Sequence, residues 1–217
     1  MNKHWSVKTW ILRVLFLVIG LTIMAFGVAL SIQANLGTSP ISSVPYVVSC
    51  FTPLTVGTAT IIMHCVFILL QILILRKQYE WMQLLQLAVA FIFGYLCDFA
   101  VYLTQWVNCP NYLAQWVCCL IGIFLVAVGV SCEVSADVVP LAGEGLSLAI
   151  CKVAPIKFGT MKVIFDLSLV CIAIVLGLLF VGSLTGVREG TIAAALLVGT
   201  ISRKLNIPLG KLAQKLS

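Results

Sequence analysis

The sequence predicts an all-α integral membrane protein: six transmembrane helices form two inverted three-helix repeats, each with a short re-entrant or broken helix after its first span. Three observations predict this fold, namely the composition, the length of the apolar runs and an internal repeat. Of the 217 residues, 62% are hydrophobic and 9% are charged, whereas soluble domains carry about 25% charged residues. No stretch between the apolar runs is long enough for a soluble domain, so we expect residues 1–217 to form a single membrane domain.

The internal repeat becomes visible when the numbering is shifted by 102 residues. This shift places Pro53 on Pro155 and the dipeptide Gly57-Thr58 on Gly159-Thr160, without any gap. Because two helix-breaking signals coincide, the match indicates an ancient duplication rather than chance. Repeat one covers about residues 11–106 and repeat two about residues 113–205, and a cytoplasmic tail, 206–217, follows.

Six apolar segments approach the roughly 20 residues that a helix needs to cross a bilayer. They are 11–33, 57–75, 82–106, 113–134, 160–181 and 188–205. Two shorter apolar segments, 41–51 and 146–154, follow the first and fourth spans and are short enough to be re-entrant. If they crossed the membrane, the chain would have eight spans, and this alternative stays open.

The distribution of basic residues favours six spans, with both termini in the cytoplasm. Twelve of the 13 Lys and Arg residues then lie on the inner side, and only Arg188 lies outside, as the positive-inside rule requires. Eight spans would move Arg76 and Lys77 to the outer face. Three spans per repeat is an odd number, so the second repeat must insert upside down. In transporters with this symmetry, the broken helices of the two halves meet near the midplane and form the solute site.

Several short motifs follow one another in a fixed order over nearly the whole chain. They are Asn35-Leu36-Gly37-Thr38-Ser39-Pro40, Gly57-Thr58, the turn Gly143-Glu144-Gly145-Leu146, and Glu189-Gly190-Thr191 leading to Ala195-Leu196-Leu197-Val198-Gly199-Thr200. In these motifs the chain resembles the YczE/YitT-type family of bacterial polytopic membrane proteins. The resemblance implies a multi-span plasma-membrane protein and supplies no substrate. Members of that family tend to carry Asp where this chain has Glu144.

Three acids, Glu133, Asp137 and Glu144, cluster around the break in the second repeat. A charge inside a membrane costs about 2.5–3.5 kcal/mol on insertion scales, so it needs a partner, a cavity or a pathway. We hypothesise that Glu144, which lies between two glycines, binds a cation or a proton, with Asp137 and Glu133 on its path. The alternative is that the acids are interfacial and pair with Lys152 and Lys157.

The first repeat carries uncharged polar residues at the matching positions. Ser31, Asn35 and Ser42 are the equivalents of the three acids. The dipeptides that contain Thr58 and Thr160 each begin a helix, so their N–H groups suit either an anionic solute group or ordinary helix capping. The candidate binding residues are therefore Glu144, Asp137, Asn35, Ser39, Ser42, Thr58 and Thr160.

His64 and Asp166 occupy equivalent positions in the second and fifth spans. Together with Glu133 they are candidates for a proton relay. The alternative is structural: Asp166 pairs with Lys162, four residues before it, and His64 donates to a backbone carbonyl group. Asp98 is equivalent to Arg203 at a shift of 105, which indicates a role in orientation.

These features favour a secondary transporter, or a channel, for a small cationic or neutral solute, with proton coupling as an option. The alternative is a non-transporting scaffold or accessory protein of a partner complex. We do not expect an enzyme, because the sequence has no HExxH, GxSxG or metal-spaced His/Asp pattern, and we expect no metal or cofactor. The expected partners are the lipid bilayer and a small-molecule solute, and not nucleic acid, because the basic residues flank apolar runs. Association into a homo-oligomer is left open.

Overall fold

The computed structural model describes residues 7–215, and the side chains of residues 7–210. The start of the predicted cytoplasmic N-terminus, with Lys3, and the last two residues of the predicted tail lie outside the described residues. The helices are α1 (Val7–Gln33), α2 (Pro40–Phe51), α3 (Val56–Leu75), α4 (Leu85–Thr104), α5 (Tyr112–Ala136), α6 (Ala142–Val153), α7 (Phe158–Leu176) and α8 (Glu189–Lys215). Short helical turns are η1 (Arg76–Gln78), η2 (Trp81–Leu84) and η3 (Gly177–Val181).

Within the described residues, six helices are long and apolar enough to cross a membrane: α1, α3, α4, α5, α7 and α8. The six predicted spans are confirmed in number and place. The other two helices, α2 and α6, have 12 residues each and are therefore about 18 Å long, shorter than the roughly 30 Å of a hydrocarbon core.

One predicted boundary is wrong, and the last helix extends into the predicted tail. α6 begins at Ala142 rather than near residue 146, so Glu144 lies in the first turn of a helix and not in a turn before it. The helix starts early because the carbonyl group of Leu141 already accepts the N–H of Gly145 at 2.9 Å. α8 continues through Pro208 to Lys215, so most of the predicted tail belongs to the last helix.

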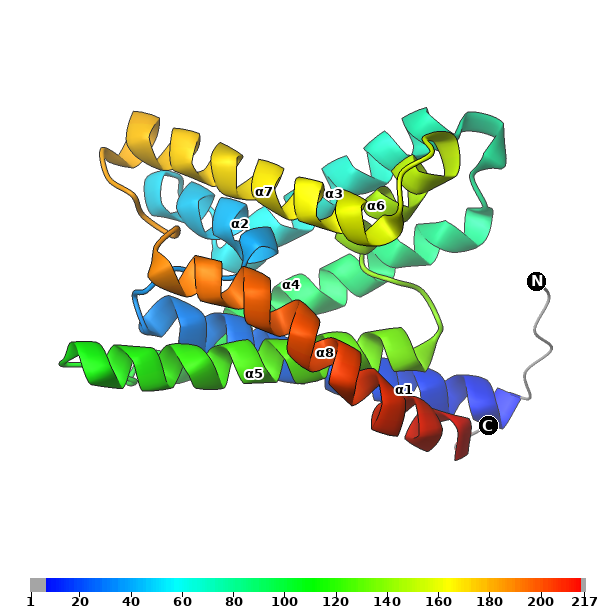
Figure 1. The fold of residues 1–217 in the computed structure, drawn as a ribbon, viewed down its shortest axis with the longest axis horizontal. Coiled ribbons are helices and arrows are strands. Elements are labelled where there is room, and N and C mark those ends of the chain that lie inside the picture. The colour runs from blue at the N-terminus through cyan, green and yellow to red at the C-terminus, as the bar shows by residue number, and fades with distance from the viewer. Residues whose placement is uncertain (1–6, 216–217) are drawn as a thin grey trace.

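The backbone repeats with the register that the sequence predicts. Shifting α2 by 102 residues reproduces both ends of α6. Asn35 and Asp137, which the same shift relates, both have a left-handed backbone with a φ of 53°. They end α1 and α5, and in each half the chain then turns back toward the centre of the molecule (Figure 1).

The most extensive helix packing is between α1 and α5, which lie side by side and run in opposite directions (Figure 1). Gly20 meets Gly129, and Gly27 meets Gly122. A Cβ atom on Gly27 would lie 2.7 Å from the carbonyl oxygen of Gly122. Because Gly122 and Gly129 are the repeat equivalents of Gly20 and Gly27, each contact becomes the other when the halves are exchanged. This is the relation that a two-fold axis in the membrane plane produces, and it agrees with inverted repeats.

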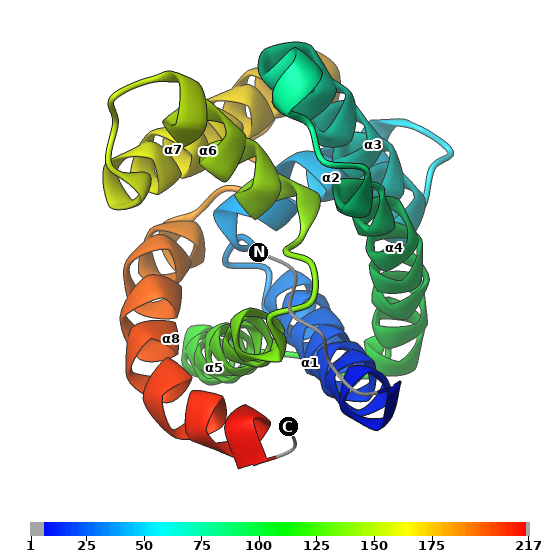
Figure 2. The same ribbon diagram turned by 90° about the vertical axis from the view of Figure 1, so that its right-hand side faces the viewer.

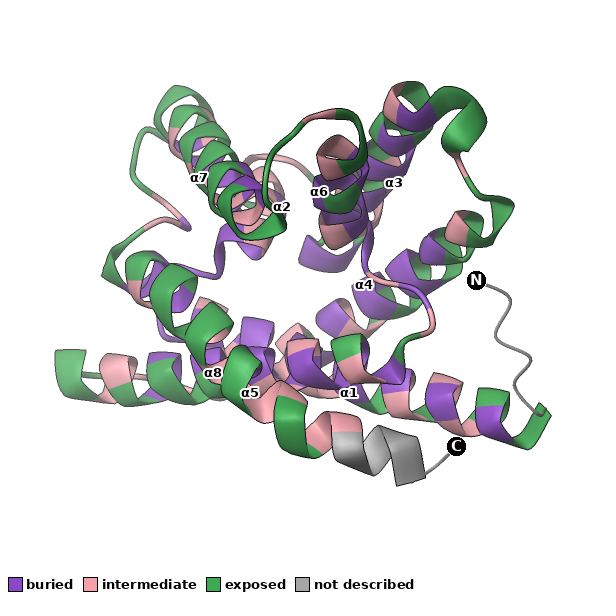
Figure 3. Cartoon of the chain, turned by 45° about the vertical axis from the view of Figure 1, so that its right-hand side comes forward, coloured by how far each residue is buried: buried purple, intermediate pink, exposed green. Residues whose placement is uncertain are grey.

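The contacts of the remaining helices are related by the same two-fold symmetry. α4 packs against α1 and α8 packs against α5, while α2 packs against α7 and α6 against α3. Each short helix thus packs on a long helix of the other half. Seen end-on, the long helices form a ring with α2 visible inside it (Figure 2). Buried residues lie on the inward faces of the helices, whereas α7 and α8 are exposed over much of their length (Figure 3).

Candidate functional site

The first turns of α2 and α6 meet at the centre of the molecule. A Cβ atom on Gly143 of α6 would lie 2.6 Å from Cδ1 of Ile41 on α2. Ile41 and Gly143 are repeat equivalents, so their contact lies on the pseudo-two-fold axis. Both helices point their N-termini toward this axis, and each N-terminus carries a partial charge of about +0.5.

The two chain segments that lead to this point are not helical. Non-helical backbone is tolerated at membrane depth only where protein or a wet cavity surrounds it. In the first half, Leu36 and Thr38 are fully buried. Their backbone is paired with the start of α8: the Thr38 N–H donates to Gly186 at 3.1 Å, and the Gly190 N–H donates to Leu36 at 2.8 Å. The meeting point is therefore held by the long helices around it.

Glu133, on α5, is the acid that orders the entry to α6. Its side chain is buried, and its Oε1 accepts the backbone N–H of Leu141 at 2.6 Å. Its second oxygen, Oε2, is buried without a hydrogen-bond partner among the described residues. One oxygen thus fixes the segment before α6, and the other can still accept a hydrogen bond or bind a cation.

Glu144, in the first turn of α6, interacts electrostatically with Lys162 and Asp166 on α7. Glu133 interacts electrostatically with Glu144 and with Lys162. Lys162 donates to Asp166 at 2.9 Å, which confirms the local pair that the sequence allowed. The charge of Lys162 therefore interacts with three carboxyl groups. In a membrane protein such charges need a partner or a function.

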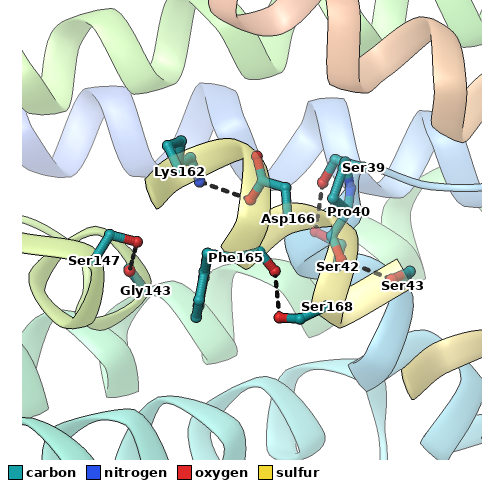
Figure 4. Close-up of polar contacts among 10 residues, drawn as sticks. All are labelled: Ser39, Pro40, Ser42, Ser43, Gly143, Ser147, Lys162, Phe165, Asp166 and Ser168. Atoms are coloured by element: carbon teal, nitrogen blue, oxygen red, sulfur yellow. Dashed lines mark hydrogen bonds and ion pairs between the residues drawn. The ribbon is translucent and has the colours of Figure 1, made fainter. Parts of the chain in front are cut away.

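Hydroxyl groups line the first turn of α2 on the other side of the axis. The Ser39 hydroxyl donates to Ser42 at 3.0 Å, and the Ser43 hydroxyl donates to the carbonyl group of Pro40 at 2.7 Å. α2 packs against α7, and Figure 4 shows Ser39 and Ser42 beside the Lys162–Asp166 pair. We call the following residues the central cluster: Ser39, Ser42, Glu133, Glu144, Lys162 and Asp166.

Asn35 and Asp137 lie in the turns that end α1 and α5, and not in the central cluster. The carbonyl group of Asn35 accepts Nη1 of Arg188 at 2.9 Å. Asp137 lies 4.0 Å from Nη1 of Arg13, which also donates to the carbonyl group of Ala136 at 3.0 Å. An arginine from the other half thus supports each turn. The sequence offers Lys152 and Lys157 as partners of the acids. In the structure Asp137 lies near Arg13 instead, and Glu144 interacts with Lys162.

Thr58 and Thr160 lie in the first turns of α3 and α7. The N–H of Thr58 donates to the Thr55 hydroxyl at 3.1 Å, and Asp98 of α4 accepts the N–H of Gly57 at 2.7 Å. The capping interpretation is therefore confirmed for α3, and Asp98 has a definite role at that helix start. Thr160 is exposed on α7, which begins without a side-chain cap.

His64 is fully buried on α3 between the rings of Phe67 and Phe93, at centroid distances of 6.0 and 6.2 Å. Its Nδ1 is buried and has no hydrogen-bond partner in the described part of the chain. α3 and α7 meet through Phe67 and Phe165, whose ring centroids are 5.3 Å apart. The carboxylate of Asp166 is held by Lys162, so the relay with His64 stays a prediction.

Sequence reasoning missed a buried amide pair that holds α6. Nε2 of Gln71 on α3 donates to Oε1 of Gln86 on α4 at 2.9 Å and to the carbonyl group of Ala142 at 3.1 Å. A Cβ atom on Gly145 would lie 2.5 Å from Nε2 of Gln86, which explains the second glycine around Glu144. The signal was present, because Gln71 lies inside an apolar run and Gln86 near the start of another.

In the described part of the chain, no group of three or more His, Cys, Asp or Glu side chains is arranged to hold a metal ion. What the central cluster offers instead is carboxylate oxygens, hydroxyl groups and two helix N-termini. Such groups can bind a monovalent or organic cation, a polar neutral molecule or a proton.

Residues 11–206 match the model of a family of unknown function, DUF6198. The chain belongs to this family. It is also similar to the uncharacterized protein YyaS of Bacillus subtilis (strain 168), with 32% identity over 114 residues, which is 51% of this chain and 54% of that protein. The match thus spans about half of the length of YyaS. No solved structure matches this DUF6198 chain. The resemblance to YczE/YitT-type proteins is not confirmed by these matches, which support DUF6198 as the family.

Proposed function

We propose that this DUF6198 protein is a secondary transporter, or a channel, of the bacterial plasma membrane for a small cationic or neutral solute. The solute would bind at the central cluster, where α2 and α6 meet. One observation carries the proposal: Glu144 lies in the first turn of α6, Glu133 holds the segment before it, and both interact electrostatically with Lys162, which pairs with Asp166 at 2.9 Å. Ionisable residues at such depth are costly and commonly mark ion or substrate pathways.

The charges of the central cluster support the class of solute. Two half-helix N-termini alone would repel cations, as they do in some water-selective pores. Here Glu133, Glu144 and Asp166 outnumber Lys162, so the carboxylates offset the helix ends and leave negative charge for a solute. The unpartnered oxygen of Glu133 and its interaction with Glu144 also suit a shared proton, which would couple solute movement to a proton gradient.

The proposed topology places both termini in the cytoplasm, as the basic residues predict. α2 then enters from outside and α6 from the cytoplasm, and each contributes one wall of the solute site. A scaffold protein would not need ionisable groups at this junction.

The test is solute binding and uptake by the purified protein. Thermal-shift screening in detergent against cations, amino acids and vitamins would identify a stabilising solute, and its uptake would then be measured in liposomes with and without a proton gradient. We expect Glu144→Gln to reduce uptake at least about tenfold, because the variant loses a charge-assisted contact that accounts for roughly that factor.

The matched control is Glu80→Gln, which makes the same chemical change at an exposed position between η1 and η2. It should leave binding and uptake unchanged. If Glu144→Gln and Glu80→Gln transport equally well, Glu144 has no part in the mechanism. If no solute of any class shifts the melting temperature or enters the liposomes, the scaffold alternative takes the place of the transporter.

A further inference from the structure

The two halves of this molecule hold their third and fourth helices differently. α3 packs against α4 in the first half, whereas α7 makes no comparable contact with α8 in the second, although both helices are described. In Figure 1, α7 and α8 lie apart, and the segment after η3 connects them. One duplicated unit thus adopts two arrangements in a single structure.

Two glycines and one aspartate close α3 on α4. A Cβ atom on Gly94 would lie 2.8 Å from the carbonyl oxygen of Gly57, so the two backbones are in direct contact. Asp98 accepts the N–H of Gly57 at 2.7 Å and the hydroxyl of Thr55 at 2.6 Å. Small residues allow such close approach in membranes, and a carboxylate stabilises a helix N-terminus.

The second half retains the equivalent glycines, but they form no close contact between α7 and α8. Gly159 corresponds to Gly57, and Gly199 corresponds to Gly94. A Cβ atom added to either would meet nothing within 4 Å, and both residues are exposed. Val163 corresponds to Ile61, which packs on Gly94, and yet Val163 is 59% exposed.

We propose that this protein has a second state in which α7 packs against α8 through Gly159 and Gly199, while Asp98 releases α3 from α4. In the observed state the end of the molecule with Gly57 and Gly94 is closed and the end with Gly159 and Gly199 is open. In the second state the two ends exchange their arrangements. This is the behaviour of inverted repeats that move against each other around a fixed site.

The central cluster lies between these two ends, because α2 runs from the axis toward the closed end and α6 toward the open one. The exchange would therefore expose the cluster first to one side of the membrane and then to the other. The inference rests on the proposed function for this purpose, but the closure itself can be measured without any solute.

The charges near the starts of α3 and α7 explain why the observed state is preferred over the second one. Where the first half has Asp98 and Thr55, the second has Arg203 and Lys157. Closing α7 on α8 would bring two positive side chains toward a positive helix end, with no carboxylate to hold it. The closed α7–α8 arrangement is therefore the less populated one, and a carboxylate at position 203 should favour it.

The first experiment is hydrogen–deuterium exchange of the full-length protein in lipid nanodiscs, comparing Arg203→Asp with Arg203→Asn. We expect Arg203→Asp to slow exchange of the first-turn amides of α7 by about tenfold or more, the effect of one hydrogen bond to a charged group. Arg203→Asn, which removes the positive charge without adding a carboxylate, should not reach this protection. Adding Gly199→Leu to Arg203→Asp should restore fast exchange, because leucine holds the helices apart. Equal exchange in Arg203→Asp and Arg203→Asn, or protection that survives Gly199→Leu, would overturn the proposal.

The second experiment does not depend on the stability of a charge variant. Gly159→Cys and Gly199→Cys are combined in the otherwise unchanged protein, since neither position has a neighbour to disturb. A disulfide requires Cα atoms about 4.4–6.8 Å apart, so mild oxidation traps the pair only when α7 closes on α8. Mass spectrometry of the linked peptides identifies the 159–199 disulfide despite the natural cysteines. The control pair is Gly159→Cys with Ile192→Cys, which lies toward the other end of α8.

A 159–199 disulfide that forms more readily than the control link supports closure, and its absence overturns it. The outcome is separable from that of the proposed function. If the disulfide forms but no solute is taken up, the second state is supported and the proposed transport function is not. If a solute is taken up but the disulfide does not form, transport is supported and the second state is not.

Discussion

Glu133 shows how one side chain can have both a structural and a functional task. Its bond to the N–H of Leu141 fixes the segment that leads into α6. Its other oxygen is a buried acceptor without a partner, and such a group costs about 1–3 kcal/mol. A proton or a cation on this oxygen would recover that free energy, so the residue is expected to bind one.

The two tasks of Glu133 can be separated by substitution. Glu133→Gln keeps a carbonyl acceptor for Leu141 but removes the charge, so we expect near-normal thermal stability together with loss of cation or proton binding. Glu133→Leu also removes the acceptor and should lower the free energy of unfolding by about 1–3 kcal/mol. Thermal unfolding in detergent and solute thermal shifts measure the two effects. Equal stability of the two variants would show that the hydrogen bond to Leu141 does not contribute to the free energy of unfolding.

At this scale the sequence predicts the acids better than their partners. Glu133 and Glu144 stand out because a carboxylate in an apolar run has few purely structural explanations. The sequence pairs Lys162 only with Asp166, its neighbour on the same helix, because spacing along a helix can be read from the chain. Its approach to Glu144 depends on how α7 crosses α6, which no local pattern contains.

Glycine contacts set the distances between the helices. Gly27 illustrates the rule, because an added Cβ atom would lie 2.7 Å from the Gly122 carbonyl oxygen and from the Val126 nitrogen. Both are backbone atoms of α5 and cannot rotate away. The contact between α1 and α5 therefore leaves no room for even one methyl group.

We expect Gly27→Ala to destabilise the protein by about 1–3 kcal/mol, the usual cost of overpacking a core. Gly199→Ala is the matched control, because it makes the same change on a helix surface with nothing within 4 Å, and it should not destabilise the protein, because alanine favours a helix more than glycine does. Unfolding by a denaturing detergent in mixed micelles would measure both. A stable Gly27→Ala variant would mean that α1 and α5 can separate without cost.

For the whole molecule, the register of the duplication predicts most of the architecture. The shift of 102 residues places α6 opposite α2 and makes Asn35 and Asp137 equivalent, and the backbone repeats accordingly. The separation of α7 from α8 could not be predicted in this way. Gly159 and Gly199 carry the same pattern as Gly57 and Gly94, and a pattern of small residues specifies a possible contact, not whether it is made.

The number of crossings decides on which side of the membrane each loop lies, and one position distinguishes the six-span from the eight-span arrangement. Gln78, an exposed residue of η1, is cytoplasmic if α2 is re-entrant and external if α2 crosses. Leu184, between η3 and α8, is external in both arrangements and 54% exposed. We expect a membrane-impermeant thiol reagent to label Leu184→Cys on intact cells and to leave Gln78→Cys unlabelled until the cells are opened. The unsubstituted protein reports labelling of the natural cysteines. Labelling of Gln78→Cys on intact cells would mean that α2 crosses the membrane, and the meeting of two half-helices at a central site would have to be abandoned.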